Sequence, residues 1–166
     1  MKNHFHWNFV SGAILFFVVM VTQGCSTSSP PSLVGTQAPY TRVLLLDGEY
    51  IPLPLYDGRR VAVMFWASWC PHSRSVIGDF ESLAEENASR KDLWFLAVSV
   101  DKATDEKQYL TFLKEQNLKS LRHAYSGNAE LDEAYLSYGL RNIPYFYLLS
   151  ADGTILAEGD HPGDLF

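Results

Sequence analysis

The chain of 166 residues has only two cysteines and fewer basic than acidic residues, 13 against 19. Two cysteines are too few for a small fold held together by several disulfides. The net charge is −6 and no run of five lysines or arginines occurs, so nucleic acid is not an expected partner. No uninterrupted apolar run reaches the roughly 20 residues that a membrane-spanning helix needs. With 47% hydrophobic residues, the chain can still form one packed domain.

The first 24 residues have the composition of an export signal. Lys2 supplies a small positive start, and Phe9 to Val21 is mostly apolar but short, as in a signal peptide. The stretch ends at Gly24 and Cys25, in a segment that resembles a bacterial lipobox. This resemblance implies that Cys25 is the lipid anchor and the new N-terminus. Ordinary cleavage and an uncleaved anchor remain open, and all three alternatives export the domain.

A linker separates the predicted anchor from the predicted domain. Ser26 to Ser32 is rich in serine, threonine and proline, a composition typical of an exposed spacer. We therefore expect a signal peptide over residues 1–24, the anchor and a flexible linker over 25–38, and a folded domain over 39–166. The location that follows is the cell envelope, as a periplasm-facing lipoprotein. Ser26 after the anchor favours the outer membrane if the organism is Gram-negative.

Strand and helix patterns alternate through the predicted domain, which indicates an α/β fold with mixed strand directions. The expected elements are a strand over 42–46, a turn at Asp47-Gly48, an irregular strand over 51–55, a buried strand over 61–66, a helix after Cys70, a buried strand over 93–100, a helix from Asp105 to Gln116 with Leu110, Phe112 and Leu113 inward, a helix from Asn128 to Gly139, and a hairpin of 145–149 with 154–157. Asp105 and Asn128 are the expected N-caps of their helices.

The second cysteine lies where a buried strand meets a helix, in the run from Phe65 to Ser73 (FWASWCPHS). Unpaired backbone N–H groups and the helix dipole favour an anion at such a position. Pro71 suits the first helical turn, because its missing N–H has no helical partner there. We therefore expect Cys70 to form a thiolate readily and to act as a nucleophile.

This run resembles the active-site segment of the thioredoxin superfamily, especially its membrane-attached TlpA-like and ResA-like bacterial branch. The family motif is Trp-Cys-x-x-Cys, and here Ser73 stands at the second cysteine. The resemblance extends over roughly residues 40–160. It implies a thioredoxin fold, with a central mixed β-sheet flanked by helices and an N-terminal β-hairpin. This chain would have that fold with a shortened C-terminus.

The resemblance also implies roles for other residues. It places Trp69 beside the thiol and makes Ile143-Pro144 the cis-proline segment opposite Cys70, where a bound peptide pairs. With Pro71 they form the expected substrate-binding set. The Pro-His spacer resembles that of DsbA-type oxidases, so His72 joins Cys70 and Ser73 as a catalytic candidate. A solvated loop position is the alternative for His72.

Two departures from the family pattern affect the expected chemistry. Met64 occupies the place where thioredoxin has a buried acid that assists proton transfer. Ser73 cannot attack a mixed disulfide as a second cysteine would, although its hydroxyl could donate a hydrogen bond to Cys70. Cys70 should therefore attack disulfides but depend on an external thiol or redox partner for release.

A third departure concerns the end of the chain. Only eight residues follow Glu158, where the family adds a last helix over one face of the sheet. That face could be partly bare, covered by Leu165 and Phe166, or covered by a partner.

The leading hypothesis is an exported, membrane-tethered monothiol protein that exchanges thiols and disulfides, as a reductase or isomerase, on cell-envelope proteins. The alternative is a redox-inactive binding or chaperone module with a thioredoxin fold.

Thiol peroxidase is disfavoured, because Ala67 and Val63 stand where that class places Thr or Ser and Pro. We expect no cofactor and no metal, and interpret His123 and His161 as ordinary packed or surface residues.

The lipid anchor gives a direct prediction. We expect the mature protein to carry lipid on Cys25, because the preceding segment resembles a lipobox. Intact mass and globomycin-sensitive processing in the native host measure this. A mature protein with a free or disulfide-bonded Cys25 would contradict it.

Overall fold

The computed structural model describes residues 32–166. The predicted signal peptide, the anchor Cys25 and most of the Ser/Pro-rich linker lie outside these residues. The elements are β1 (Thr41–Leu44), β2 (Tyr50–Leu53), β3 (Arg60–Trp66), α1 (Pro71–Glu86), β4 (Leu93–Ser99), η1 (Ala103–Asp105), α2 (Glu106–Glu115), β5 (Arg122–Tyr125), η2 (Ala129–Leu131), α3 (Glu133–Ser137), β6 (Tyr145–Leu149), β7 (Ile155–Gly159) and η3 (Pro162–Leu165). Over this part of the chain, no helix is long and apolar enough to cross a membrane.

Strand β3 is the centre of a five-stranded sheet with the order β5-β4-β3-β6-β7. It pairs in parallel with β4 and antiparallel with β6, and β4 pairs in parallel with β5. The sheet is therefore mixed, which confirms the predicted fold class. Residues 61–66 are all 0% exposed, because both faces of β3 lie in packed cores.

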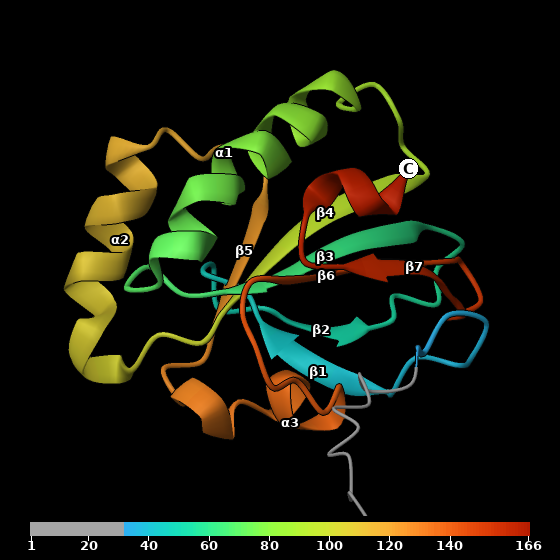
Figure 1. Ribbon diagram of the computed structural model, residues 1–166, viewed down its shortest axis with the longest axis horizontal. Coiled ribbons are helices and arrows are strands. Elements are labelled where there is room, and N and C mark those ends of the chain that lie inside the picture. Colours follow the sequence, from blue (N-terminus) through green and yellow to red (C-terminus); the bar gives the residue numbers. More distant parts are fainter. Residues whose placement is uncertain (1–31) are drawn as a thin grey trace, which may run out of the picture. The chain divides into compact units, whose positions relative to one another are not determined.

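Helices α1 and α2 cover one face of this sheet (Figure 1). Their core contains alternate residues of β3, Ala62, Met64 and Trp66, packed against apolar positions of both helices. The apolar positions of α1 recur at helical spacing, and the buried ones are Val76, Ile77, Phe80 and Ala84. This period makes α1 amphipathic and presses its first turn against the carboxyl end of β3.

The opposite face of the sheet is covered by the β1–β2 hairpin and α3 (Figure 1). The hairpin forms a two-stranded antiparallel sheet of its own, with Val43 opposite Ile51. Gly48 adopts φ +89° in the connection, a conformation that glycine takes without strain. The predicted N-terminal hairpin and its Asp47-Gly48 turn are thus confirmed.

The end of the chain packs on the α1 side of the sheet. Leu165, in η3, is 3% exposed and belongs to the same core as α1. The ring of Phe166 lies 6.3 Å from that of Phe95 on β4. Of the three alternatives left by the sequence, the one in which the last residues cover the sheet holds for Leu165, whereas Phe166 is 59% exposed at the edge of this packing.

Three details of the predicted helices are wrong. Leu110 is 43% exposed, and Tyr109 takes the inward place on α2. The reason is that Tyr109 lies three and four residues before Phe112 and Leu113, and residues at this spacing share one face of a helix. Asp105 is the N-cap of α2, but its side chain makes no capping hydrogen bond. The helix expected from Asn128 is split into η2 and α3, and Asp132 caps α3 by accepting from the N–H groups of Ala134 and Tyr135.

The sequence analysis also missed β5, a short parallel strand beside β4. The side chain of His123 on this strand is largely buried. Its Nε2 lies 3.1 Å from the carbonyl oxygen of Leu118, and its Nδ1 has no hydrogen-bond partner within residues 32–166. Contacts also start before the predicted boundary at residue 39. The N–H of Gly35 donates to Ile155, and that of Ala38 donates to Gly153.

We predict that Leu165→Ala lowers the free energy of unfolding by about 2–4 kcal/mol, because it leaves a cavity between η3 and the sheet. Urea unfolding followed by circular dichroism measures this. Leu156→Ala is the control, since Leu156 is 44% exposed and should change stability by less than about 0.5 kcal/mol. Equal effects of the two substitutions would contradict the packing of η3.

A second prediction concerns pH. Burial lowers the pKa of His123 below its ordinary value, outweighing the hydrogen bond to Leu118 and the charge of Glu81. The unfolded chain then binds the proton first as pH falls below about 6.5, so His123 reduces stability progressively below that pH. His123→Gln should flatten this part of the stability profile while keeping a donor for Leu118. A slope between pH 7 and 5 identical to that of wild type would contradict the burial of a neutral imidazole.

Candidate thiol site at the start of α1

Cys70 occupies the N-cap of α1, directly after the loop that leaves β3. Its backbone is extended, with φ −83° and ψ 116°, and its Sγ accepts from the backbone N–H of Ser73 at 3.5 Å. The residue is 9% exposed and forms no disulfide among the described residues. The thiol therefore lies at the helix end where unpaired N–H groups favour negative charge.

The segment before β6 lies on the other side of the thiol. The Ile143–Pro144 peptide bond is cis, as expected from the resemblance. The Sγ of Cys70 is 3.7 Å from the carbonyl oxygen of Ile143, close enough for a thiol to donate a weak hydrogen bond. The structure thus brings Cys70 and the predicted cis-proline segment together although 73 residues separate Cys70 from Ile143.

Ser73 is 0% exposed and lies one helical turn after Cys70. Its backbone N–H, rather than its hydroxyl, reaches the Cys70 sulfur. The hydroxyl oxygen instead accepts from the N–H of Ala67, with a long distance of 3.5 Å. Ser73 therefore closes the loop before the helix, and the hydroxyl contact with the thiol that the sequence allowed is not formed among the described residues.

The remaining predicted site residues are neighbours of Cys70 in the sequence, and all three are exposed. Trp69 is 48% exposed immediately before Cys70, and Pro71 is exposed as the first residue of α1. His72 is also exposed, and its imidazole makes no hydrogen bond or ion pair within residues 32–166. The proposed roles of these three side chains in binding and catalysis stay predictions.

Two side chains near the thiol were missed by the sequence analysis. Tyr135 of α3 packs against the small cluster of Ala67, Cys70 and Val100. Burial, with a smaller effect from Glu130, raises the pKa of Tyr135, so its hydroxyl stays protonated at neutral pH. Because α3 is short and follows an irregular segment, its sequence pattern gave no sign that Tyr135 approaches Cys70.

The second missed residue is Asp101, which follows β4 and is 0% exposed. One carboxylate oxygen accepts from the hydroxyl of Ser68 at 2.7 Å. The other accepts from the N–H of Ser68 at 2.9 Å and from the hydroxyl of Ser99 at 2.7 Å. A polar residue at the carboxyl end of a buried parallel strand is the signal that could have identified it, since such ends meet at one edge of a sheet.

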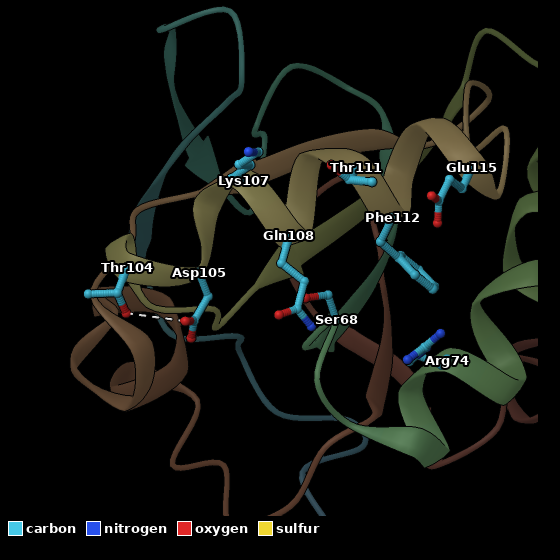
Figure 2. A pocket seen from close by; sticks show the side chains of 9 residues that line it. All are labelled: Ser68, Arg74, Thr104, Asp105, Lys107, Gln108, Thr111, Phe112 and Glu115. Atoms are coloured by element: carbon cyan, nitrogen blue, oxygen red, sulfur yellow. Dashed lines mark hydrogen bonds between the residues drawn. The ribbon is translucent and has the colours of Figure 1, made fainter.

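A cavity of about 470 Å³ opens beside the same loop, between α1 and α2. Figure 2 shows Arg74 of α1 directed toward Phe112 of α2, with Ser68 and Gln108 nearby. The Arg74 guanidinium lies 5.0 Å from the centre of the Phe112 ring, a cation–π contact. Cys70 is not among the residues that line this cavity, so the cavity is separate from the thiol site.

The chemistry available at this site is that of one thiol, Cys70, next to the backbone of the Ile143-Pro144 segment. Among residues 32–166, no group of three or more His, Cys, Asp or Glu side chains is placed to hold a metal ion. A thiol at a helix N-terminus, opposite a cis-proline segment and on a mixed sheet, defines the class of thioredoxin-fold thiol proteins.

The chain belongs to the thioredoxin-like family, whose pattern matches residues 58–155. It is 25% identical over 149 residues to the thiol-disulfide oxidoreductase ResA of Bacillus cereus, covering 90% of this chain and 80% of that protein. It is 30% identical over 122 residues to the thioredoxin-like protein YneN of Bacillus subtilis, covering 73% and 68%.

A solved structure agrees with this assignment. A thiol-disulfide oxidoreductase from Bacteroides fragilis superposes with a TM-score of 0.66 at 26% identity, over 74% of this chain and 89% of that one. The chain is therefore a ResA-like member of the thioredoxin superfamily, with the fold of thiol-disulfide oxidoreductases.

Proposed function

We propose that this chain is an exported, membrane-tethered protein that exchanges thiols and disulfides through Cys70 alone. The observation that carries the proposal is the position of Cys70 at the N-cap of α1, 3.7 Å from the Ile143 carbonyl, with Ser73 behind it. The family supports thiol–disulfide chemistry. The export signal, the lipid on Cys25 and the location in the cell envelope are proposed from the sequence.

The first step is attack of the Cys70 thiolate on a substrate disulfide. A bond forms between Cys70 and one substrate sulfur, and the other substrate sulfur leaves as a thiolate. The exposed Trp69 and the backbone around Ile143-Pro144 are the proposed surfaces for the substrate chain. His72, exposed on the first turn of α1, is the proposed second polar group near the developing charge.

The second step needs a thiol that the described site does not contain. In a two-cysteine site, the second thiolate attacks the mixed disulfide with an effective concentration that reaches about 10⁵ M or more in well-oriented systems. Ser73 cannot supply this attack, because its hydroxyl is neither ionised nor thiophilic at neutral pH. Release then requires a second thiol of the substrate, which gives isomerisation, or an external thiol, which gives stepwise reduction.

We predict that Ser73→Cys raises turnover with a disulfide substrate and an external dithiol by at least about tenfold, because it supplies an intramolecular attacking thiol. Reduction of an oxidised model protein measures turnover. The comparison is made in a Cys25→Ala background, which removes the other thiol of the chain.

Ser75→Cys is the matched control, since it adds a thiol on the exposed face of the same helix. Cys70→Ala should abolish turnover. If wild type forms no mixed disulfide with any unfolded, oxidised substrate and Cys70→Ala fully complements a deletion strain, the thiol is not the function, and the non-covalent binding module becomes the better hypothesis.

A further inference from the structure

The turn from Ala67 to Cys70 is held by a buried carboxylate that the exchange chemistry described above does not use. Asp101 accepts both the N–H and the hydroxyl of Ser68, at 2.9 and 2.7 Å. The turn is closed by the N–H of Cys70, which donates to Ala67 at 3.1 Å. Position 68 is thus fixed to the end of β4, two residues before the nucleophile.

Asp101 is itself held rigidly. The hydroxyl of Ser99 donates to its carboxylate at 2.7 Å and accepts from its backbone N–H at 3.0 Å. Next to it, the N–H of Val100 donates to Trp66 at 2.9 Å, joining β4 to the end of β3. The Asp101 carboxylate accepts several hydrogen bonds and has no exposed surface, so its position is fixed. It can therefore hold the Ala67–Cys70 turn in one conformation.

We propose that Asp101 is a positioning residue for Cys70, which fixes the Ala67–Cys70 turn through Ser68 and thereby sets how readily the thiol reacts. This inference rests on the proposed exchange function for its biological meaning, but the reactivity of the thiol can be measured without it. Two effects of Asp101 oppose each other. The hydrogen bonds hold the turn in the reactive geometry, while the buried negative charge disfavours a thiolate nearby.

Other charged or titratable groups lie on the segments packed around the thiol and must be considered with it. They are His72 and Arg74 on α1, Asp101 and Lys102 after β4, Asp132, Glu133 and Tyr135 at α3, and Arg141 before Ile143. Within the described residues, Asp101 is the one among them whose side chain bonds to the turn.

Two substitutions separate the two effects. Asp101→Asn removes the charge but retains the bonds, because the amide oxygen can accept from the Ser68 N–H and the Ser99 hydroxyl while the amide nitrogen donates to the Ser68 oxygen. Asp101→Ala removes both. Ser68→Ala removes one of the two bonds to the turn and leaves the carboxylate in place.

The test measures iodoacetamide alkylation of the Cys70 peptide by mass spectrometry against pH, and the rate of reaction with the disulfide 5,5′-dithiobis(2-nitrobenzoate). For Asp101→Asn, the alkylation midpoint should move to lower pH, because the nearby negative charge is removed, and the plateau rate should stay within about twofold of wild type. For Asp101→Ala, the disulfide reaction should slow about tenfold, and for Ser68→Ala it should slow by a smaller factor.

Glu81→Gln is the matched control. Glu81 is also a buried carboxylate and accepts three backbone N–H groups, from residues 119–121. It lies about 16 Å along α1 from Cys70, at 1.5 Å per residue. This variant should lose stability without any change in the alkylation midpoint, measured below its own unfolding transition.

A purely structural Asp101 gives a different result. Asp101→Asn would then leave the midpoint unchanged, and Asp101→Ala would react at the wild-type rate once its unfolded fraction is subtracted. Either finding overturns the proposal. If the Asp101 variants behave as expected but no protein disulfide reacts with wild type, the exchange function fails and the positioning role stands.

Discussion

The constraint on which the site depends is the abrupt change from β3 to α1 at Cys70. The strand must end, the chain must turn within four residues, and the helix must begin with its N–H groups directed at a sulfur. The burial of β3 on both faces fixes the start of this turn, and the apolar face of α1 fixes its end. The thiol is therefore placed by the burial of β3 and the packing of α1, and its contact with Ile143 follows from the pairing of β3 with β6.

Much of this arrangement could be predicted from the sequence, because it depends on local patterns. A few neighbouring residues are enough to predict each of three features. They are the uniformly apolar β3, the helical period from Val76 to Ala84 and the turn at Asp47-Gly48. The cis peptide bond before Pro144 was predicted only from the family resemblance. Tertiary packing decided the rest. Residues 122–125 form a strand because β4 offers an edge, and the short segment 133–137 becomes a helix because Asp132 caps it.

The site itself was predictable where it depends on the motif and not where it depends on contacts between distant segments. Cys70 and Ile143-Pro144 came together as expected. Asp101 did not stand out, because its role requires that β4 end beside the turn at Ser68. The possible contact between the Ser73 hydroxyl and the thiol depended on the geometry of the helix N-terminus. This geometry directs the backbone N–H of Ser73 to the sulfur and turns its side chain toward Ala67.

The absence of a thiol at position 73 changes what the site can accumulate. A site with two cysteines clears its own mixed disulfide, whereas Cys70 has a serine one helical turn away, and the buried residue at position 64 of β3 is an apolar methionine. The direct measurement is intact-mass spectrometry, under non-reducing conditions, of the Cys25→Ala protein mixed with an oxidised, unfolded substrate. The account predicts a one-to-one adduct through Cys70 when free thiols are quenched with acid, and loss of this adduct when an external thiol is added before the quench. Unmodified masses alone, as in a Cys70→Ala control, would contradict it.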